Sequence, residues 1–170
     1  MAKYLEHDGA GGAREVNAAT TGGAPDANKI AQLDANGKFP AAMMPSGVGS
    51  DTQVFQASEN LSAGDLVNIW SSSGAFRVRR ADASGGAAKK AMGYVLAAVT
   101  SGANATVYFE GTNDQIATVL TPGDVYLSAA QPGQVTQTPP NTATHIVQRV
   151  GFASTSTALN FEASDPITLA

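Results

Sequence analysis

The sequence contains no cysteine among its 170 residues, which excludes disulfide bonds and thiolate-ligated metal sites. Charged residues make up only 14% of the chain, against about 25% in an average soluble protein. The formal net charge of −4 offers no concentrated positive field to phosphate groups, so we expect no nucleic-acid partner. Since no segment approaches the roughly 20 apolar residues that cross a bilayer, we expect no membrane partner either. No secretory signal is visible at the start, which predicts synthesis in the cytoplasm.

The motifs of a catalytic or metal centre are also missing. His145 is the only histidine in a strand-like segment, and no Gly-x-Ser-x-Gly turn accompanies it. The turn at residues 34–37 lacks the glycine position and the distal glutamate of a calcium loop. A pair of catalytic carboxylates forms only in space, so the sequence leaves that possibility open. We therefore expect no enzyme, no catalytic residue, no metal and no cofactor.

Residues 1–50 differ in composition from the rest of the chain. Gly9 to Ala27 holds too few large apolar side chains to offset the entropy of ordering the backbone, so it predicts an extended or flexible N-terminal arm. Larger apolar side chains follow, separated by a turn at Asn36-Gly37, and residues 47–50 are typical of a hinge. These side chains are too sparse to form a core, and we interpret them as docking residues that contact a partner surface: Ile30, Leu33, Phe39, Met43 and Met44.

Residues 51–170 predict a mostly β domain. Short β-branched or aromatic runs alternate with Gly, Pro, Ser and Asn, and no window keeps a helical period. This pattern predicts a small β-barrel or β-sandwich. The expected strands are Asp65–Trp70, Phe76–Arg80, Met92–Val99, Ala105–Phe109, Ile116–Leu120, Asp124–Leu127, Gln134–Gln137, Ile146–Ala153 and Ala158–Phe161.

The β domain shows an internal duplication, with repeat units at about 61–111 and 120–163. The aligned segments are 61–67 with 120–126, 74–76 with 133–135, 92–95 with 150–153, and 107–110 with 159–162. Two units of four strands each predict one barrel around a pseudo-twofold axis. Each unit begins with a Gly-Asp pair that we interpret as a structural turn: Gly64 and Asp65 in the first, Gly123 and Asp124 in the second.

Half of the ten basic residues fall within a short stretch of this acidic chain: Arg77, Arg79, Arg80, Lys89 and Lys90. One reading is a solvated hairpin face. The other is a contact to an acidic protein surface through guanidinium–carboxylate pairs, which adds Arg77, Arg79 and Arg80 to the docking residues.

Two segments resemble proteins of tailed-bacteriophage particles. Residues 30–40 followed by Met43-Met44-Pro45 are similar to a linker common in phage fibre and virion proteins. Residues 120–128, 133–136 and 148–153 resemble the β domain of phage head-fibre and capsid decoration (cement) proteins. The resemblance implies a structural homotrimer on the outer capsid surface of the virion, bound to the major capsid protein and reinforcing the shell. It carries over no catalytic residue.

A tail-fibre or receptor-binding β module is the alternative. Trp70, Tyr94, Tyr108 and Tyr126 would then serve as platforms for stacking a host sugar, although aromatic residues in strands more often pack in the core. A hydrolase of cell-wall or capsule glycans is a third hypothesis, which needs two carboxylates in one cleft. The sequence does not separate a head location from a tail location.

Overall fold

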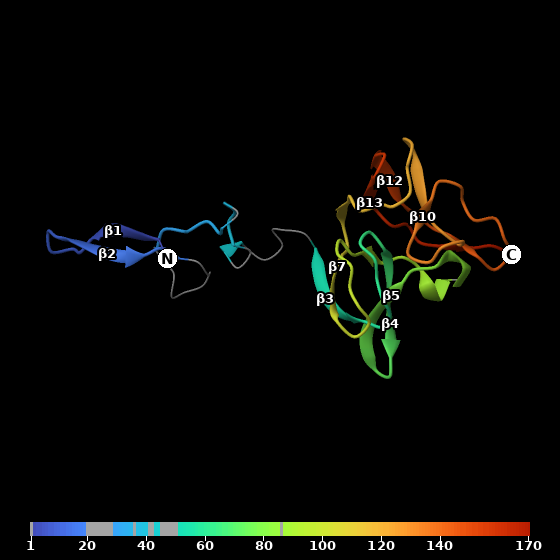
Figure 1. Ribbon diagram of the computed structural model, residues 1–170, viewed down its shortest axis with the longest axis horizontal. Coiled ribbons are helices and arrows are strands. Elements are labelled where there is room, and N and C mark those ends of the chain that lie inside the picture. Colours follow the sequence, from blue (N-terminus) through green and yellow to red (C-terminus); the bar gives the residue numbers. More distant parts are fainter. Residues whose placement is uncertain (1, 20–28, 36, 41–42, 45–50, 86) are drawn as a thin grey trace. The chain divides into compact units, whose positions relative to one another are not determined.

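The computed structural model describes residues 2–19, 29–35, 37–40, 43–44, 51–85 and 87–170. The chain divides into two compact units, Met1–Gly49 and Ser50–Ala170, here called the N-terminal unit and the β unit (Figure 1). The predicted hinge at residues 47–50 lies outside the described residues. The boundary between the two units falls within it, between Gly49 and Ser50.

The described chain is mostly β, as the sequence predicts. Two short 3-10 helices, η3 (Ala83–Gly85) and η4 (Ala87–Lys89), lie in the β unit. The strands are β1 (Lys3–His7), β2 (Ala13–Asn17), β3 (Thr52–Ala57), β4 (Leu66–Ser72), β5 (Ala75–Arg80), β6 (Gly93–Tyr94), β7 (Asn104–Tyr108), β8 (Gly111–Asn113), β9 (Asp124–Leu127), β10 (Val135–Thr136), β11 (Ile146–Val147), β12 (Arg149–Thr155), β13 (Ala158–Phe161) and β14 (Ile167–Thr168).

The N-terminal unit begins with a β-hairpin where the sequence predicted an extended or flexible arm. β1 and β2 pair antiparallel, and the Asp8 carboxylate closes their turn by accepting hydrogen bonds from the amides of Ala10 (2.8 Å) and Gly12 (2.9 Å). Two ion pairs cross the hairpin, Lys3–Glu15 at 2.8 Å and Arg14–Glu6 at 2.9 Å. The count of apolar side chains does not indicate this hairpin, because polar contacts close its turn and cross its strands.

Strands β3, β5, β4, β6 and β7 form a closed barrel in that order. β3 closes it, because it pairs antiparallel with β7 on one side and parallel with β5 on the other. Val67, Val78 and Val107 fill the interior and are fully buried. Closure rests on few backbone pairs, because β3 meets β5 only at Gln56–Arg77 and Ala57–Val78, and β6 meets β7 only at Tyr94–Tyr108.

A second sheet has the order β10-β9-β12-β13-β8. The barrel strands, read as β5-β4-β6-β7-β3, have the same arrangement. β8, β9, β10, β12 and β13 take the places of β3, β4, β5, β6 and β7 in turn, in the same order along the chain. The expectation that two four-stranded units close one barrel was wrong. Each segment forms its own sheet, because β3 and β8 supply a fifth strand beside β7 and β13.

A second core lies between the barrel and this sheet. Neighbouring residues of β4 serve the two cores in turn: Leu66 packs in the second core and Val67 inside the barrel, as the alternation of side chains along a strand requires. The expected strand Ile116–Leu120 is not a strand. Ile116 and Leu120 are buried in this core, and their amides bond to the carbonyl oxygens of Thr157 (3.3 Å) and Ser156 (2.9 Å).

We predict that Gly64→Ala destabilises the protein more than Gly123→Ala. Both glycines have a positive φ, 85° and 143°, so each alanine costs about 1–3 kcal/mol in backbone strain. A Cβ at Gly64 would also lie 2.0 Å from the carbonyl oxygen of Gln115, whereas a Cβ at Gly123 meets nothing within 4 Å. Urea unfolding of the two variants measures the difference. Equal loss of stability would contradict the close approach at Gly64.

Candidate functional site

The predicted docking residues of the N-terminal unit are largely exposed. The exposed fractions are 58% for Ile30, 47% for Leu33, 59% for Phe39 and 42% for Met44, and Met43 is half-buried. Leu5 of β1, which the sequence reasoning missed, is 74% exposed. In the described part of this unit the buried apolar residues are only Ala18 and Ala19. The unit therefore holds its larger apolar side chains in contact with solvent.

Backbone contacts present these side chains. The Ala19 amide donates to the carbonyl oxygen of Ile30 (2.9 Å), and the Gln32 amide donates to the carbonyl oxygen of Ala19 (2.8 Å). These two hydrogen bonds connect the segment that carries Ile30 to the end of the hairpin. The Asp34 carboxylate then accepts the amide of Lys38 at 2.9 Å, turning the chain between Leu33 and Phe39. The predicted turn falls here, although Asn36 itself lies outside the described residues.

The predicted basic cluster does not form one surface. Arg80 and Lys89 form ion pairs within the β unit, Arg80 with Glu59 at 3.5 Å and Lys89 with Asp82 at 3.6 Å. Arg77 and Arg79 project from the other side of β5, because side chains alternate along a strand. Of the three docking arginines, then, only Arg77 and Arg79 share the outer face of the barrel.

The two outward arginines bind neutral groups of neighbouring strands. Arg77 donates to the side-chain oxygen of Gln56 on β3. Arg79 donates to the side-chain oxygen of Asn68 at 3.0 Å, and its guanidinium lies 4.6 Å from the ring centroid of Trp70. The positive charge of Arg77 meets no carboxylate at ion-pair distance among the residues that the structure describes.

The aromatic residues considered as sugar platforms mostly pack within the β unit. Tyr94 is buried and stacks on Tyr108, with ring centroids 5.5 Å apart, and its ring packs at a tilt of 56° against Phe161, with centroids 5.4 Å apart. Trp70 lies under Arg79 and donates its indole N–H to the Ser58 hydroxyl at 3.1 Å. Tyr126 is half-buried. These contacts occupy the faces that a stacked sugar would need.

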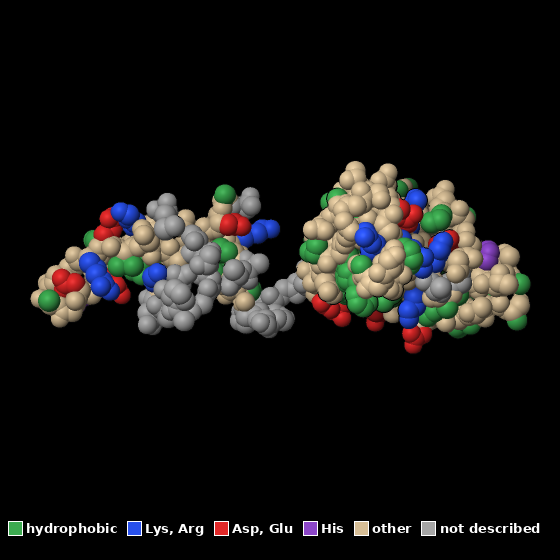
Figure 2. Space-filling model, turned by 90° about the horizontal axis from the view of Figure 1, so that it is seen from below, with side chains coloured by type: hydrophobic (Ala, Val, Ile, Leu, Met, Phe, Trp, Pro, Cys, Tyr) green, Lys and Arg blue, Asp and Glu red, His purple; other side chains and the backbone are tan. Residues whose placement is uncertain are grey.

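An apolar hollow of about 480 Å³ opens at one end of the barrel. We call it the barrel mouth, and it is lined by Gln53, Val54, Phe55, Gln56, Ile69 and Phe76. Phe76 and Val54 are 74% and 56% exposed, whereas Phe55 and Ile69 are half-buried. Figure 2 views the β unit from the side toward which the β4–β5 hairpin points in Figure 1, and shows hydrophobic side chains gathered beside basic ones. The alternation of side chains along each strand does not predict this hollow. It forms only because the pairing of β3 with β5 brings residues of β3 close to residues of β4 and β5.

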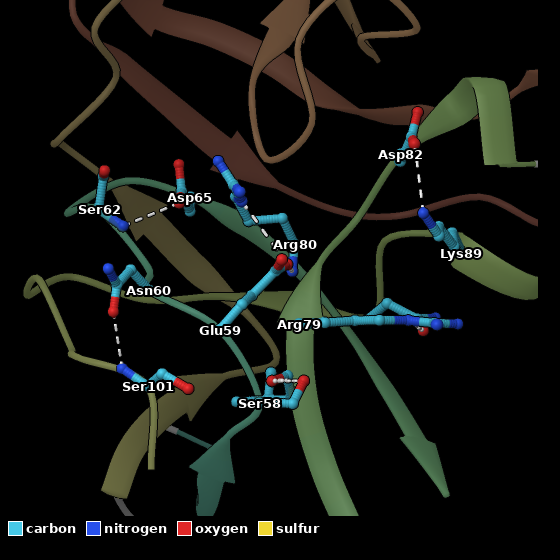
Figure 3. Close-up of polar contacts among 12 residues, drawn as sticks. Ser58, Glu59, Asn60, Ser62, Asp65, Arg79, Arg80, Asp82, Lys89 and Ser101 are labelled. Atoms are coloured by element: carbon cyan, nitrogen blue, oxygen red, sulfur yellow. Dashed lines mark hydrogen bonds and ion pairs between the residues drawn. The ribbon is translucent and has the colours of Figure 1, made fainter. Parts of the chain in front are cut away.

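The two Gly-Asp turns differ in their surroundings. Asp65 is 2% exposed and accepts hydrogen bonds from the Ser62 amide and the Gln134 side chain, both at 2.8 Å, beside Glu59 and Arg80 (Figure 3). Burial raises the pKa of the Asp65 carboxyl, although these hydrogen bonds and the Arg80 charge oppose the shift. Asp124 is instead exposed and pairs with Arg149 at 2.8 Å. Asp65 therefore joins the barrel to the segment before β10, while Asp124 joins β9 to β12.

A cavity of about 560 Å³ on the β unit holds two carboxylates, those of Glu110 and Glu162. Glu162 lies 3.8 Å from the Arg149 guanidinium, and its side chain is 70% exposed. The described residues include no group of three His, Cys, Asp or Glu side chains placed to hold a metal ion. His145 is half-buried and lies outside this cavity. Among the described residues, no helix has the length and apolar character to cross a membrane.

We predict that Asp82→Asn lowers the free energy of unfolding at pH 7 by about 1–3 kcal/mol, the cost of weakening hydrogen bonds to a buried charged group. Burial by itself would raise the pKa of Asp82, but the amide (2.9 Å) and hydroxyl (2.6 Å) of Ser84 and the Lys89 charge lower it overall from 3.8. A lowered folded-state pKa adds stability above pH 3.8 that is lost as the pH falls through the folded value.

Urea unfolding at several pH values should therefore show the difference between wild type and Asp82→Asn shrinking below pH 3.8. Asp165→Asn, at an exposed carboxylate of the same unit, is the control. A difference that stays constant down to pH 2 would mean that the Asp82 charge contributes nothing.

Comparison of the chain with protein-family models, with curated proteins and with solved structures gives no match.

Proposed function

We propose that this protein is a structural component of a tailed-phage virion that binds the outer capsid surface, as a decoration or head-fibre protein, and stabilises the shell. The observation that carries the proposal is the exposure of Ile30, Leu33, Phe39 and Met44 in a unit whose described residues bury no apolar side chain larger than alanine. Together with the resemblance of residues 30–40 to a virion linker, this exposure supports a segment that becomes buried on a partner.

The energetics favour docking by many copies. Fully burying one large apolar side chain contributes about 1.5–3 kcal/mol, and binding must first offset about 4–15 kcal/mol of lost translational and rotational freedom. The docking residues of a single copy therefore give only a marginal binding free energy. A homotrimer multiplies the contacts without repeating the full entropic cost, so a symmetric lattice of capsid subunits binds it tightly.

The β unit suits a load-bearing role. Its barrel is closed, and its two cores share β4, so the barrel and the second sheet resist separation. The receptor-binding alternative gains less support, because Tyr94, Tyr108 and Trp70 are engaged within the unit. Glu110 and Glu162 line one cavity, but the Glu162 side chain is 70% exposed and lies 3.8 Å from the Arg149 guanidinium, so we propose no hydrolase.

The first test is light scattering coupled to size-exclusion chromatography, followed by co-sedimentation with heads of the encoding phage that lack this protein. We expect a trimer that pellets with the heads at a fixed, saturable stoichiometry. A protein that ignores heads at micromolar concentration and instead pellets with host cells would replace this proposal by the receptor-binding one.

We also predict that the double variant Ile30→Ser, Phe39→Ser binds heads at least tenfold more weakly. The melting temperature of the β unit should not change, because both side chains are exposed within their own unit. Val119→Ser is the matched control, since Val119 is 77% exposed in the β unit and is not a docking residue. Unchanged head binding by the double variant would contradict the docking role of these residues.

A further inference from the structure

We propose that the barrel mouth is a second docking surface, which receives an apolar side chain lying beside a carboxylate on the capsid subunit. This inference rests on the proposed function, since it takes the capsid as the partner. It differs in location, because the first contact lies in the N-terminal unit and this one in the β unit.

The shape of the barrel points to this end. β3 and β5 pair only at Gln56–Arg77 and Ala57–Val78, and the hollow is lined by side chains of these two strands and of β4. Phe55 and Ile69 form a half-buried floor, and Phe76 and Val54 rise from the rim with most of their surface in solvent. Phe76 follows the β4–β5 turn, where Ser73 and Gly74 have φ values of 52° and 82°. The aromatic side chain that follows this turn is 74% exposed.

The size of the mouth limits what enters. Its volume of about 480 Å³ lies within the range of about 300–1,000 Å³ that is usual for sites that enclose a small group. It accommodates one or two apolar side chains of a partner, and its open shape suits a residue projecting from a neighbouring surface. Because Phe55 and Ile69 are already packed as the floor of the hollow, binding there requires little rearrangement of the β unit.

Charge selects the partner. Arg77 lies at the rim, because its guanidinium binds the side-chain oxygen of Gln56, which lines the mouth. A guanidinium has five donors, and no described carboxylate lies within ion-pair distance of this one. A partner carboxylate there would form a bidentate pair as the apolar side chain is buried. Two copies meeting mouth to mouth would bring two guanidinium groups together, which disfavours self-association at this face.

The absence of cysteine makes a direct test possible. Phe76→Cys and the control Val119→Cys are each labelled with one environment-sensitive fluorophore, and heads lacking the protein are added. We expect the emission of the label at position 76 to shift to the blue and to saturate with head concentration, while the label at position 119 is unchanged. Arg77→Glu in the unlabelled protein should weaken co-sedimentation about tenfold, with unchanged molecular mass and melting temperature.

The outcomes separate this inference from the proposed function. If the unlabelled protein pellets with heads but the label at position 76 does not shift and Arg77→Glu binds normally, the barrel mouth is not a docking surface, while the proposed function stands. If the unlabelled wild-type protein does not pellet at all, the proposed function fails and this inference fails with it. A shift at position 76 that depends on protein concentration without heads would assign the mouth to a second copy and overturn the inference.

Discussion

The β unit depends on the double pairing of β3. This strand hydrogen-bonds antiparallel to β7, with five residue pairs from Thr52–Tyr108 to Gln56–Asn104, and parallel to β5 at its other edge. Without it, β5-β4-β6-β7 would be an open sheet with two exposed edges and an uncovered apolar interior around Val67 and Val78. Closure therefore creates the inner core and brings Phe55 and Ile69 to the same hollow.

The second sheet is stable because the barrel offers it an apolar outer surface. Leu66 and Tyr94 lie on barrel strands yet pack with Val125, Leu127 and Leu159 of the other sheet. Polar contacts join the same parts: Gln148, 1% exposed, accepts the amide of Ala91 at 2.8 Å and donates to its carbonyl oxygen at 3.0 Å. Since buried polar groups must be paired, such contacts define how the two sheets fit together.

The two units differ in how far they bury their apolar side chains. The β unit buries most of its large aliphatic side chains in two cores, whereas the N-terminal unit keeps Leu5, Ile30 and Phe39 exposed and is held by ion pairs and a capped turn. Exposed ion pairs contribute little, about 0–1 kcal/mol each, so the hairpin alone is marginally stable. The proposed docking role rests on this exposed apolar surface.

Local pattern was sufficient for much of this protein. The β class, the extents of β9 and β13, and the turn positions of Gly64 and Gly123 follow from residue type and short-range alternation. The hairpin Lys3–Asn17 was missed because an Asp8 cap and crossing ion pairs carry no apolar signal. The short apolar run Ile116–Leu120 predicts a strand, but such a run has the same pattern in a buried loop, which is what it forms here.

The sequence by itself determined the β class, the absence of thiol chemistry and the presence of apolar side chains at positions 30, 33, 39, 43 and 44. Only the tertiary structure decided that the two segments form a closed barrel and a separate five-stranded sheet, that Arg80 pairs with Glu59, and that Phe55, Ile69 and Phe76 share a hollow. The reason is that strand pairing joins residues about fifty positions apart, such as Val54 and Thr106, and no local pattern encodes which distant edge a strand will meet.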